Sequence, residues 1–167
     1  MPDANSPVLR PQDLRWSEHN QGERYAARFA PLAAALGLTG LGARLVELPP
    51  GKRAWPFHHH LANEELFYIL EGRGSWRYGD RAYPVAAGDC LGVPLGGPET
   101  AHQLINDSDA PLRYLALSTM RTPDVVCYPD SDKFYVLAGT APGGPKEQRT
   151  FEHIGRLKDR VDYWDGE

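Results

Sequence analysis

The sequence predicts an all-β protein, a sandwich or barrel of many short strands, on three observations. Glycine and proline account for 32 of the 167 residues, which favours frequent turns over long helices. Hydrophobic residues make up 41% of the chain, enough to form the core of one domain of ordinary size. Short β-type runs recur with turn residues between them, a pattern typical of sandwiches and barrels.

The first segment, residues 1–40, is expected to form an N-terminal arm and an edge strand. It begins with a polar, proline-bearing stretch in which Trp16 is the only large apolar anchor. Residues 24–36 are ambiguous, because their alanines suit a helix while Pro31 interrupts it and aromatic residues alternate with small or polar ones. We favour a strand followed by a turn.

The second segment, residues 41–120, carries the clearest alternation and is expected to form the core of the barrel. Its β-type runs are separated by turn sequences such as EGRG, YGD and AAGD. The six runs lie at 43–48, 64–70, 75–78, 90–93, 101–105 and 112–118.

The last segment, residues 121–167, is expected to add strands and a C-terminal tail that pack on the barrel. In the tail, Phe151, Ile154, Leu157 and Val161 recur at every third or fourth position. This spacing permits one short amphipathic helix.

Charge and hydropathy exclude several classes of function. Eighteen basic and 22 acidic residues give a net charge of −4 without a basic run, so nucleic-acid binding is not expected. No apolar stretch approaches membrane-spanning length and the N-terminus lacks a hydrophobic leader segment, so we expect a soluble, cytoplasmic protein without a membrane partner. Cys90 and Cys127 fit no CxxC pattern and are expected to be buried free thiols, with Cys90 serving for packing.

Three consecutive histidines form the centre of the chemistry. Because alternate side chains of a strand share a face, His58 and His60 point the same way and His59 points the other way. A carboxylate of the following Glu64-Glu65 pair and His102, on a later strand, could complete a set of ligands. Imidazole and carboxylate donors together suit one divalent ion of manganese, iron, zinc, nickel or copper.

These residues resemble two motifs of the cupin superfamily. The first motif places H-x-H, a glutamate and a glycine in order, and corresponds here to GKRAWPFHHHLANEELFYILEG at 51–72. The second corresponds to GDCLGVPLGGPETAHQLIN, with its motif positions at Gly88, Pro94, Gly96, His102 and Asn106. Five residues separate Gly96 from His102 where the motif has two, and we expect this insertion to lie in a loop.

The resemblance also decides between the two glutamates. In the motif six residues separate the glutamate from the glycine, and counting back from Gly72 reaches Glu65. The resemblance therefore implies the metal ligands His58, His60, Glu65 and His102, with Glu64 and His59 outside the ligand set.

For the fold, the resemblance implies a single cupin barrel (a double-stranded β-helix, or jelly roll) with an N-terminal arm and a C-terminal tail. The chain is most similar to small single-domain cupins of the sugar-phosphate isomerase-like and polyketide-cyclase-associated types. It implies a small-molecule substrate and a homodimer. The activity we favour is a divalent-metal-dependent isomerase of sugar or sugar-phosphate type. The alternatives are an iron- or copper-dependent dioxygenase of a small aromatic or thiol substrate, and a non-catalytic ligand-binding cupin.

An isomerase of this type also needs a base, and a cation where its substrate carries a phosphate. Arg44, Lys52 and Arg53 are the candidate cations, although a charged exterior is the favoured interpretation of Lys52 and Arg53. The base is only weakly indicated, with Glu64 and Tyr68 as candidates.

Overall fold

The computed structural model describes residues 6–167, and it confirms the all-β prediction. The largest sheet has six antiparallel strands in the order β1-β2-β3-β10-β5-β8. Their bounds are β1 Ser17–Gln21, β2 Tyr25–Pro31, β3 Leu41–Leu48, β10 Leu112–Thr119, β5 Glu65–Glu71 and β8 Cys90–Val93.

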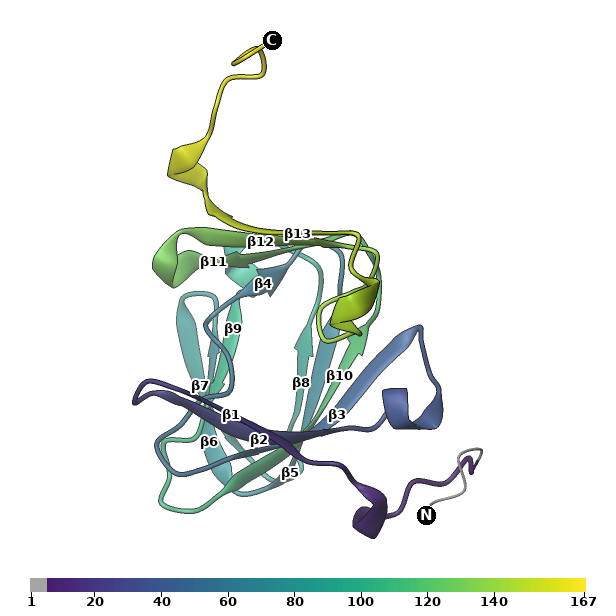
Figure 1. Ribbon diagram of the computed structural model, residues 1–167. Helices are drawn as coiled ribbons and strands as arrows, with labels where there is room; N and C mark the ends of the chain where they lie inside the picture. Colours follow the sequence, from purple (N-terminus) through teal and green to yellow (C-terminus); the bar gives the residue numbers. More distant parts are fainter. Residues whose placement is uncertain (1–5) are drawn as a thin grey trace.

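Two smaller sheets complete the structure. One has the order β7-β6-β9, and the other has the order β13-β12-β11-β4. Their bounds are β7 Arg81–Ala86, β6 Arg73–Tyr78, β9 His102–Ile105, β13 Phe151–Arg156, β12 Lys133–Ala138, β11 Asp124–Tyr128 and β4 His59–His60. Figure 1 shows β6, β7 and β9 facing the strands β5, β8 and β10, with the third sheet across one end of the space between them. The sheets face each other without closing into one continuous cylinder.

Alternation along the strands sends one face of each sheet into this space. On β5, Phe67 and Ile69 are buried whereas Leu66 and Tyr68 are exposed on the outer face. Ile69 is fully buried, and its replacement by alanine would cost about 2–5 kcal/mol through lost contacts and an internal cavity. Glu65 has the same phase as this apolar pair, so the strand carries its carboxylate into the interior.

The N-terminal segment follows the strand-and-turn interpretation. Residues 25–31 form β2, and a one-turn 3₁₀ helix, Ala34–Leu36, follows it. The hairpin of β1 and β2 pairs with β3 and so extends the six-stranded sheet. Trp16 packs beneath the guanidinium of Arg28, 4.6 Å from the ring centroid. The first five residues of the expected arm lie outside the described residues.

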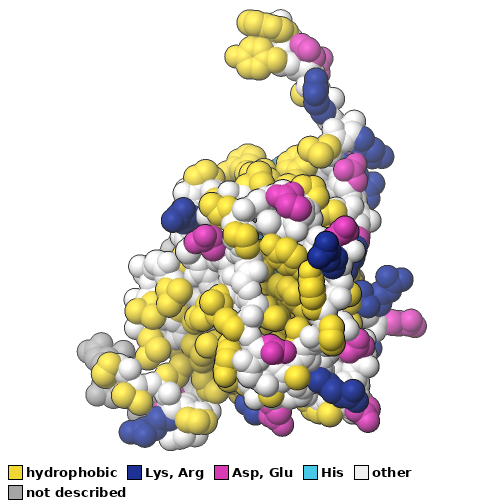
Figure 2. Space-filling model, turned by 180° about the vertical axis from the view of Figure 1, so that it is seen from behind, with side chains coloured by type: hydrophobic (Ala, Val, Ile, Leu, Met, Phe, Trp, Pro, Cys, Tyr) yellow, Lys and Arg dark blue, Asp and Glu magenta, His cyan; other side chains and the backbone are white. Residues whose placement is uncertain are grey.

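The expectation of an amphipathic helix in the tail was wrong. Residues 151–156 form β13 instead, which pairs with β12 over six residues. An isolated helix of about eleven residues has little stability of its own. The edge of β12 instead offers unpaired backbone groups, and the pairing of β13 with this edge accommodates Gly155. Beyond β13 the chain leaves the body of the protein, and the aromatic side chains of Tyr163 and Trp164 are exposed (Figures 1 and 2).

The cysteines are free, as expected, but Cys90 is not buried. Leu91 and Val93 take the inward positions of β8, so Cys90 faces outward opposite Tyr68 of β5. The packing role expected for Cys90 is therefore wrong, whereas Cys127 is half-buried. Within residues 6–167, no helix has both the length and the apolar character needed to cross a membrane.

Candidate metal centre

Three sheet elements bring the four predicted ligand residues together. His60 lies on β4, Glu65 begins β5, and a backbone bridge joins His58 to His102 at the start of β9. The Oε2 atom of Glu65 lies 2.8 Å from Nε2 of His102, 3.6 Å from Nε2 of His60 and 4.0 Å from Nε2 of His58. His58, His60 and Glu65 form the tighter group, with ligand atoms all within 4.8 Å of one another.

Hydrogen bonds orient each of the three imidazoles through Nδ1. The Nδ1 of His58 lies 2.8 Å from the carbonyl of Pro56, and that of His102 lies 3.3 Å from the carbonyl of Thr100. The Nδ1 of His60 lies 2.7 Å from a carboxylate oxygen of Asp124. Because these oxygens only accept, Nδ1 carries the hydrogen in each ring, and the neutral ring then offers its Nε2 lone pair to the centre.

Two buried atoms at the centre have no hydrogen-bond partner among the described residues: Oε2 of Glu65 and Nε2 of His102. They lie close together, but not in hydrogen-bonding alignment. Leaving buried polar atoms unsatisfied is costly, and a cation shared between them would remove that cost. His58, His60 and Glu65 therefore form a possible site for a divalent metal ion, and His102 lies beside Glu65.

The electrostatics favour the metal-binding forms of His58 and Glu65, whereas burial of His60 is outweighed by its hydrogen bond to Asp124 and by the charge of Glu65, which raise the pKa of His60. Burial, helped by the neighbouring His102, lowers the pKa of His58 to about 3, so its ring is neutral at pH 7. Burial alone would raise the pKa of Glu65, but the contact with His102 and the electrostatic influence of the three nearby imidazole groups outweigh it and lower this pKa to about 2. The carboxylate is therefore ionised at neutral pH.

Asp124 is a site residue that the sequence reasoning missed. Its side chain is buried and accepts hydrogen bonds from Nδ1 of His60, from the backbone N–H of Ala62 at 2.9 Å, and from Nδ2 of Asn63 at 2.9 Å. Asn63 in turn accepts a hydrogen bond from the backbone N–H of Arg121. Asp124 begins β11, outside both motifs, and only the pairing of β11 with β4 places it there.

Residues that the sequence placed outside the ligand set point elsewhere. His59 is buried, and its Nδ1 donates to the carbonyl of Gly96 at 3.0 Å. The candidate bases are both exposed: Glu64 immediately precedes β5, and Tyr68 lies on the outer face of β5. Neither lines the cavity above the centre. The insertion before His102 forms a one-turn 3₁₀ helix, Pro98–Thr100.

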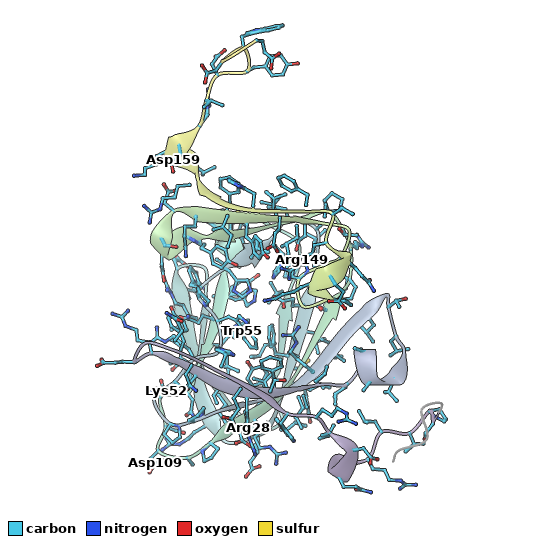
Figure 3. All side chains as sticks on the ribbon, in the orientation of Figure 1. Arg28, Lys52, Trp55, Asp109, Arg149 and Asp159 are labelled. Atoms are coloured by element: carbon cyan, nitrogen blue, oxygen red, sulfur yellow. The ribbon has the colours of Figure 1, made fainter. Side chains whose placement is uncertain are left out.

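The candidate centre opens into a cavity of about 240 Å³ between the sheets. Aromatic side chains form much of its wall: Trp55, Phe67, Trp76, Tyr114, Tyr128 and Tyr135. Figure 3 shows Trp55 within the space between the sheets, Lys52 at the periphery, and Arg149 beside the four-stranded sheet.

One of the three cations proposed from the sequence lines this cavity, and that residue is Arg44. Lys52 instead donates to the carbonyl of Glu23 at 2.6 Å, and Arg53 lies 3.4 Å from Oε1 of Gln103. Arg149 also lines the cavity, and no motif in the sequence indicated it.

Comparison with known proteins agrees with this architecture. Residues 44–118 match the family model described as "Cupin domain". The crystal structure of a "Putative sugar phosphate isomerase" from Acidithiobacillus ferrooxidans matches with a TM-score of 0.78 and 26% sequence identity. That match covers 95% of this chain and 98% of the other, so it includes most of the segments on both sides of the domain.

Two curated relatives are similar over shorter stretches. An uncharacterized protein of Methanocaldococcus jannaschii is 38% identical over 61 residues, which are 36% of this chain and 46% of that protein. An oxalate-binding protein of Thermotoga maritima is 27% identical over 68% of this chain and 90% of its own length. The match thus spans less than half of the archaeal relative and most of the bacterial one.

Proposed function

Because the chain belongs to the cupin superfamily, with its cupin domain over residues 44–118, we propose that it is a divalent-metal-dependent isomerase of sugar or sugar-phosphate type. The observation that carries the proposal is the convergence of His58, His60, Glu65 and His102 at a cavity that also contains Arg44. The similarity to the Acidithiobacillus protein over nearly the whole of both chains supports the same class of reaction.

The four residues would hold the ion through three Nε2 atoms and a carboxylate oxygen. A divalent ion bound there would supply Lewis-acid chemistry, polarising a substrate carbonyl and stabilising an enediolate. Aromatic side chains line much of the cavity, and the positive charges of Arg44 and Arg149 attract a negatively charged substrate. Manganese(II) and zinc(II) suit this role because isomerisation needs no change in oxidation state.

A second candidate, a non-catalytic ligand-binding cupin, is favoured because none of the described residues that line the cavity is a clear catalytic base. Glu65 is the only carboxylate among the described residues that line it, and Glu65 belongs to the ligand set. Burial raises the pKa of Tyr128 to about 12, so this phenol keeps its proton at neutral pH. The relative from Thermotoga is named an oxalate-binding protein, which fits a binding role.

Exchange of carbon-bound hydrogen in D₂O tests the proposal. An aldose–ketose isomerase removes a proton from the carbon next to the carbonyl and returns one to the former carbonyl carbon, so deuterium enters the product. We expect the manganese- or zinc-loaded protein to isomerise an aldose or ketose phosphate, with this exchange detected by proton NMR. The reaction should proceed without oxygen, which separates it from the dioxygenase alternative.

Two results would redirect the assignment. Binding of sugar phosphates without exchange, in fully metal-loaded protein, would favour the binding module. Consumption of oxygen by iron- or copper-loaded protein with a small aromatic or thiol substrate would favour the dioxygenase. The variant His60→Ala serves as the control for metal-dependent turnover, because it removes one ligand while the outer surface of the protein is unchanged.

A further inference from the structure

Arg44 brings a positive charge into the cavity without an acidic partner. It lies on the inner face of β3, opposite Ala116 of β10, and lines the cavity wall. Its guanidinium carbon lies 5.6 Å from the ring centroids of both Phe29 and Trp55. Among the described residues it forms no hydrogen bond or ion pair, and burial lowers its pKa. A partly desolvated cation of this kind is costly unless an anion joins it.

The outer face of the same sheet shows the contrast. There Arg28 forms two hydrogen bonds with the carboxylate of Glu47, at 2.8 and 3.0 Å. Arg113 is likewise paired, with its Nη1 3.3 Å from Glu71. The sheet therefore pairs its exposed arginines directly with carboxylates, whereas the arginine inside the cavity has no carboxylate in direct contact and feels only the more distant charge of Glu65.

A second arginine approaches the cavity from the segment after β12. The Nη1 of Arg149 donates to the hydroxyl of Tyr135 at 2.7 Å and is also paired with Glu152. Its Nε is buried without a hydrogen-bond partner among the described residues. Two guanidinium groups with only one neighbouring carboxylate leave a net positive charge at this part of the wall.

The same segment places backbone directly against Arg44. Gly143 has a φ of +82°, and a Cβ atom at this position would overlap Nη2 of Arg44. A glycine is therefore required both by the backbone conformation and by the space that the guanidinium occupies. The segment holds Arg44 in place without contributing a carboxylate.

The sheet sets the distance between Arg44 and the candidate metal centre. Glu65 of β5 lies opposite Ser118 of β10, which lies opposite Gly42 of β3, two residues before Arg44. Two strand spacings of about 4.8 Å separate β5 from β3, so their backbones lie about 10 Å apart. We therefore expect a ligand that reaches both groups to carry its metal-binding oxygens and its anionic group at different ends.

We propose that Arg44 and Arg149 form an anion subsite that binds the phosphate group of the substrate, at the far end of the molecule from the metal centre. This inference rests on the proposed function and narrows its substrate class to phosphorylated sugars. A phosphate monoester matches the two guanidinium groups better than a neutral sugar does, because each guanidinium can donate in parallel to two of its oxygens. Gly143 determines specificity indirectly, by leaving room for the guanidinium of Arg44.

The test measures binding of inorganic phosphate to the full-length, metal-free protein by calorimetry, so that neither turnover nor metal occupancy enters the result. Arg44→Gln removes the charge, and Arg44→Lys keeps the charge but loses the planar fork. Arg28→Gln is the matched control, because it removes an arginine of the same sheet that faces outward. We expect wild type to bind phosphate, Arg44→Gln to bind it about 10- to 100-fold more weakly, and Arg28→Gln to match wild type.

A second variant, Gly143→Ala, displaces the guanidinium without changing any charge, and it should weaken phosphate binding as well. Thermal unfolding of each variant verifies that it is folded. The proposal is overturned if wild type binds no phosphate at millimolar concentration, if the Arg44 variants bind it as wild type does, or if acetate binds more tightly than phosphate. Phosphate binding that depends on Arg44 in a protein without isomerase activity would support the subsite and reject the proposed reaction.

Discussion

Replacing Asp124 by asparagine tests how the candidate metal centre is held. The carboxylate is buried and accepts three hydrogen bonds, two at Oδ2 from His60 and Asn63, and one at Oδ1 from Ala62. An asparagine side chain is almost the same size but has only one accepting oxygen. The substitution therefore changes charge and hydrogen bonding while it leaves packing intact.

The structure gives the magnitude. If the amide oxygen faces His60, the amide nitrogen faces the N–H of Ala62, and one buried donor is unsatisfied at a cost of about 1–3 kcal/mol in unfolding free energy. The hydrogen bond to His60 also loses its ionic character, which makes Nε2 of His60 a weaker ligand for a metal ion. Loss of such a partner behind a ligating histidine typically weakens metal binding by about 10- to 100-fold.

Competition with a chromophoric chelator for zinc measures this affinity near neutral pH, and urea unfolding of the metal-free protein measures stability. Asp130→Asn is the control, because this carboxylate pairs with Arg77 at the surface and does not contact the candidate centre. We expect Asp124→Asn to bind zinc more weakly than wild type, and Asp130→Asn to bind it as tightly as wild type. A folded Asp124→Asn protein that binds zinc as tightly as wild type would refute the positioning argument.

Three other predictions concern the ligands, the thiols and the tail. Zinc at about 100 times its Kd should stabilise wild type by about 2.7 kcal/mol. In a thermal-shift titration, His60→Ala should lose most of this stabilisation, whereas His59→Ala should retain it. Equal losses would contradict the opposite directions of the His59 and His60 side chains. Cys90 should react quickly with Ellman's reagent in the folded protein and Cys127 more slowly, because burial raises the pKa of the Cys127 thiol; equal rates would contradict this difference. The homodimer expected from the sequence should give twice the chain mass of 18.6 kDa by light scattering, and truncation after Arg156 should weaken it by removing exposed apolar side chains; a monomeric full-length protein would exclude it.

The sequence predicts those parts of the structure that depend on local alternation. The alternation of inward and outward residues on β5 is a property of one strand, and it puts Glu65 on the same face as Phe67 and Ile69. The opposite directions of His59 and His60 follow from the same rule. Turn residues on either side of these strands were sufficient to indicate an all-β protein.

Other features depend on contacts between distant segments and leave no local pattern. Asp124 reaches His60 because β11 pairs with β4, and no spacing rule relates two residues 64 positions apart. Arg149 lines the cavity because the segment after β12 folds back towards β3. In the tail, by contrast, a local pattern was misleading. The spacing of apolar residues from Phe151 suits a helix, but residues 151–156 pair with the free edge of β12 instead.

X-ray absorption spectroscopy of untagged protein, purified without added metals and then loaded with one equivalent of zinc, tests whether His58, His60, Glu65 and His102 hold a metal ion. We expect one tightly bound ion per chain, with about three imidazole nitrogens and one carboxylate oxygen at roughly 2.0–2.2 Å. Zinc bound without imidazole scattering, or protein that retains no zinc after dialysis, would contradict this expectation.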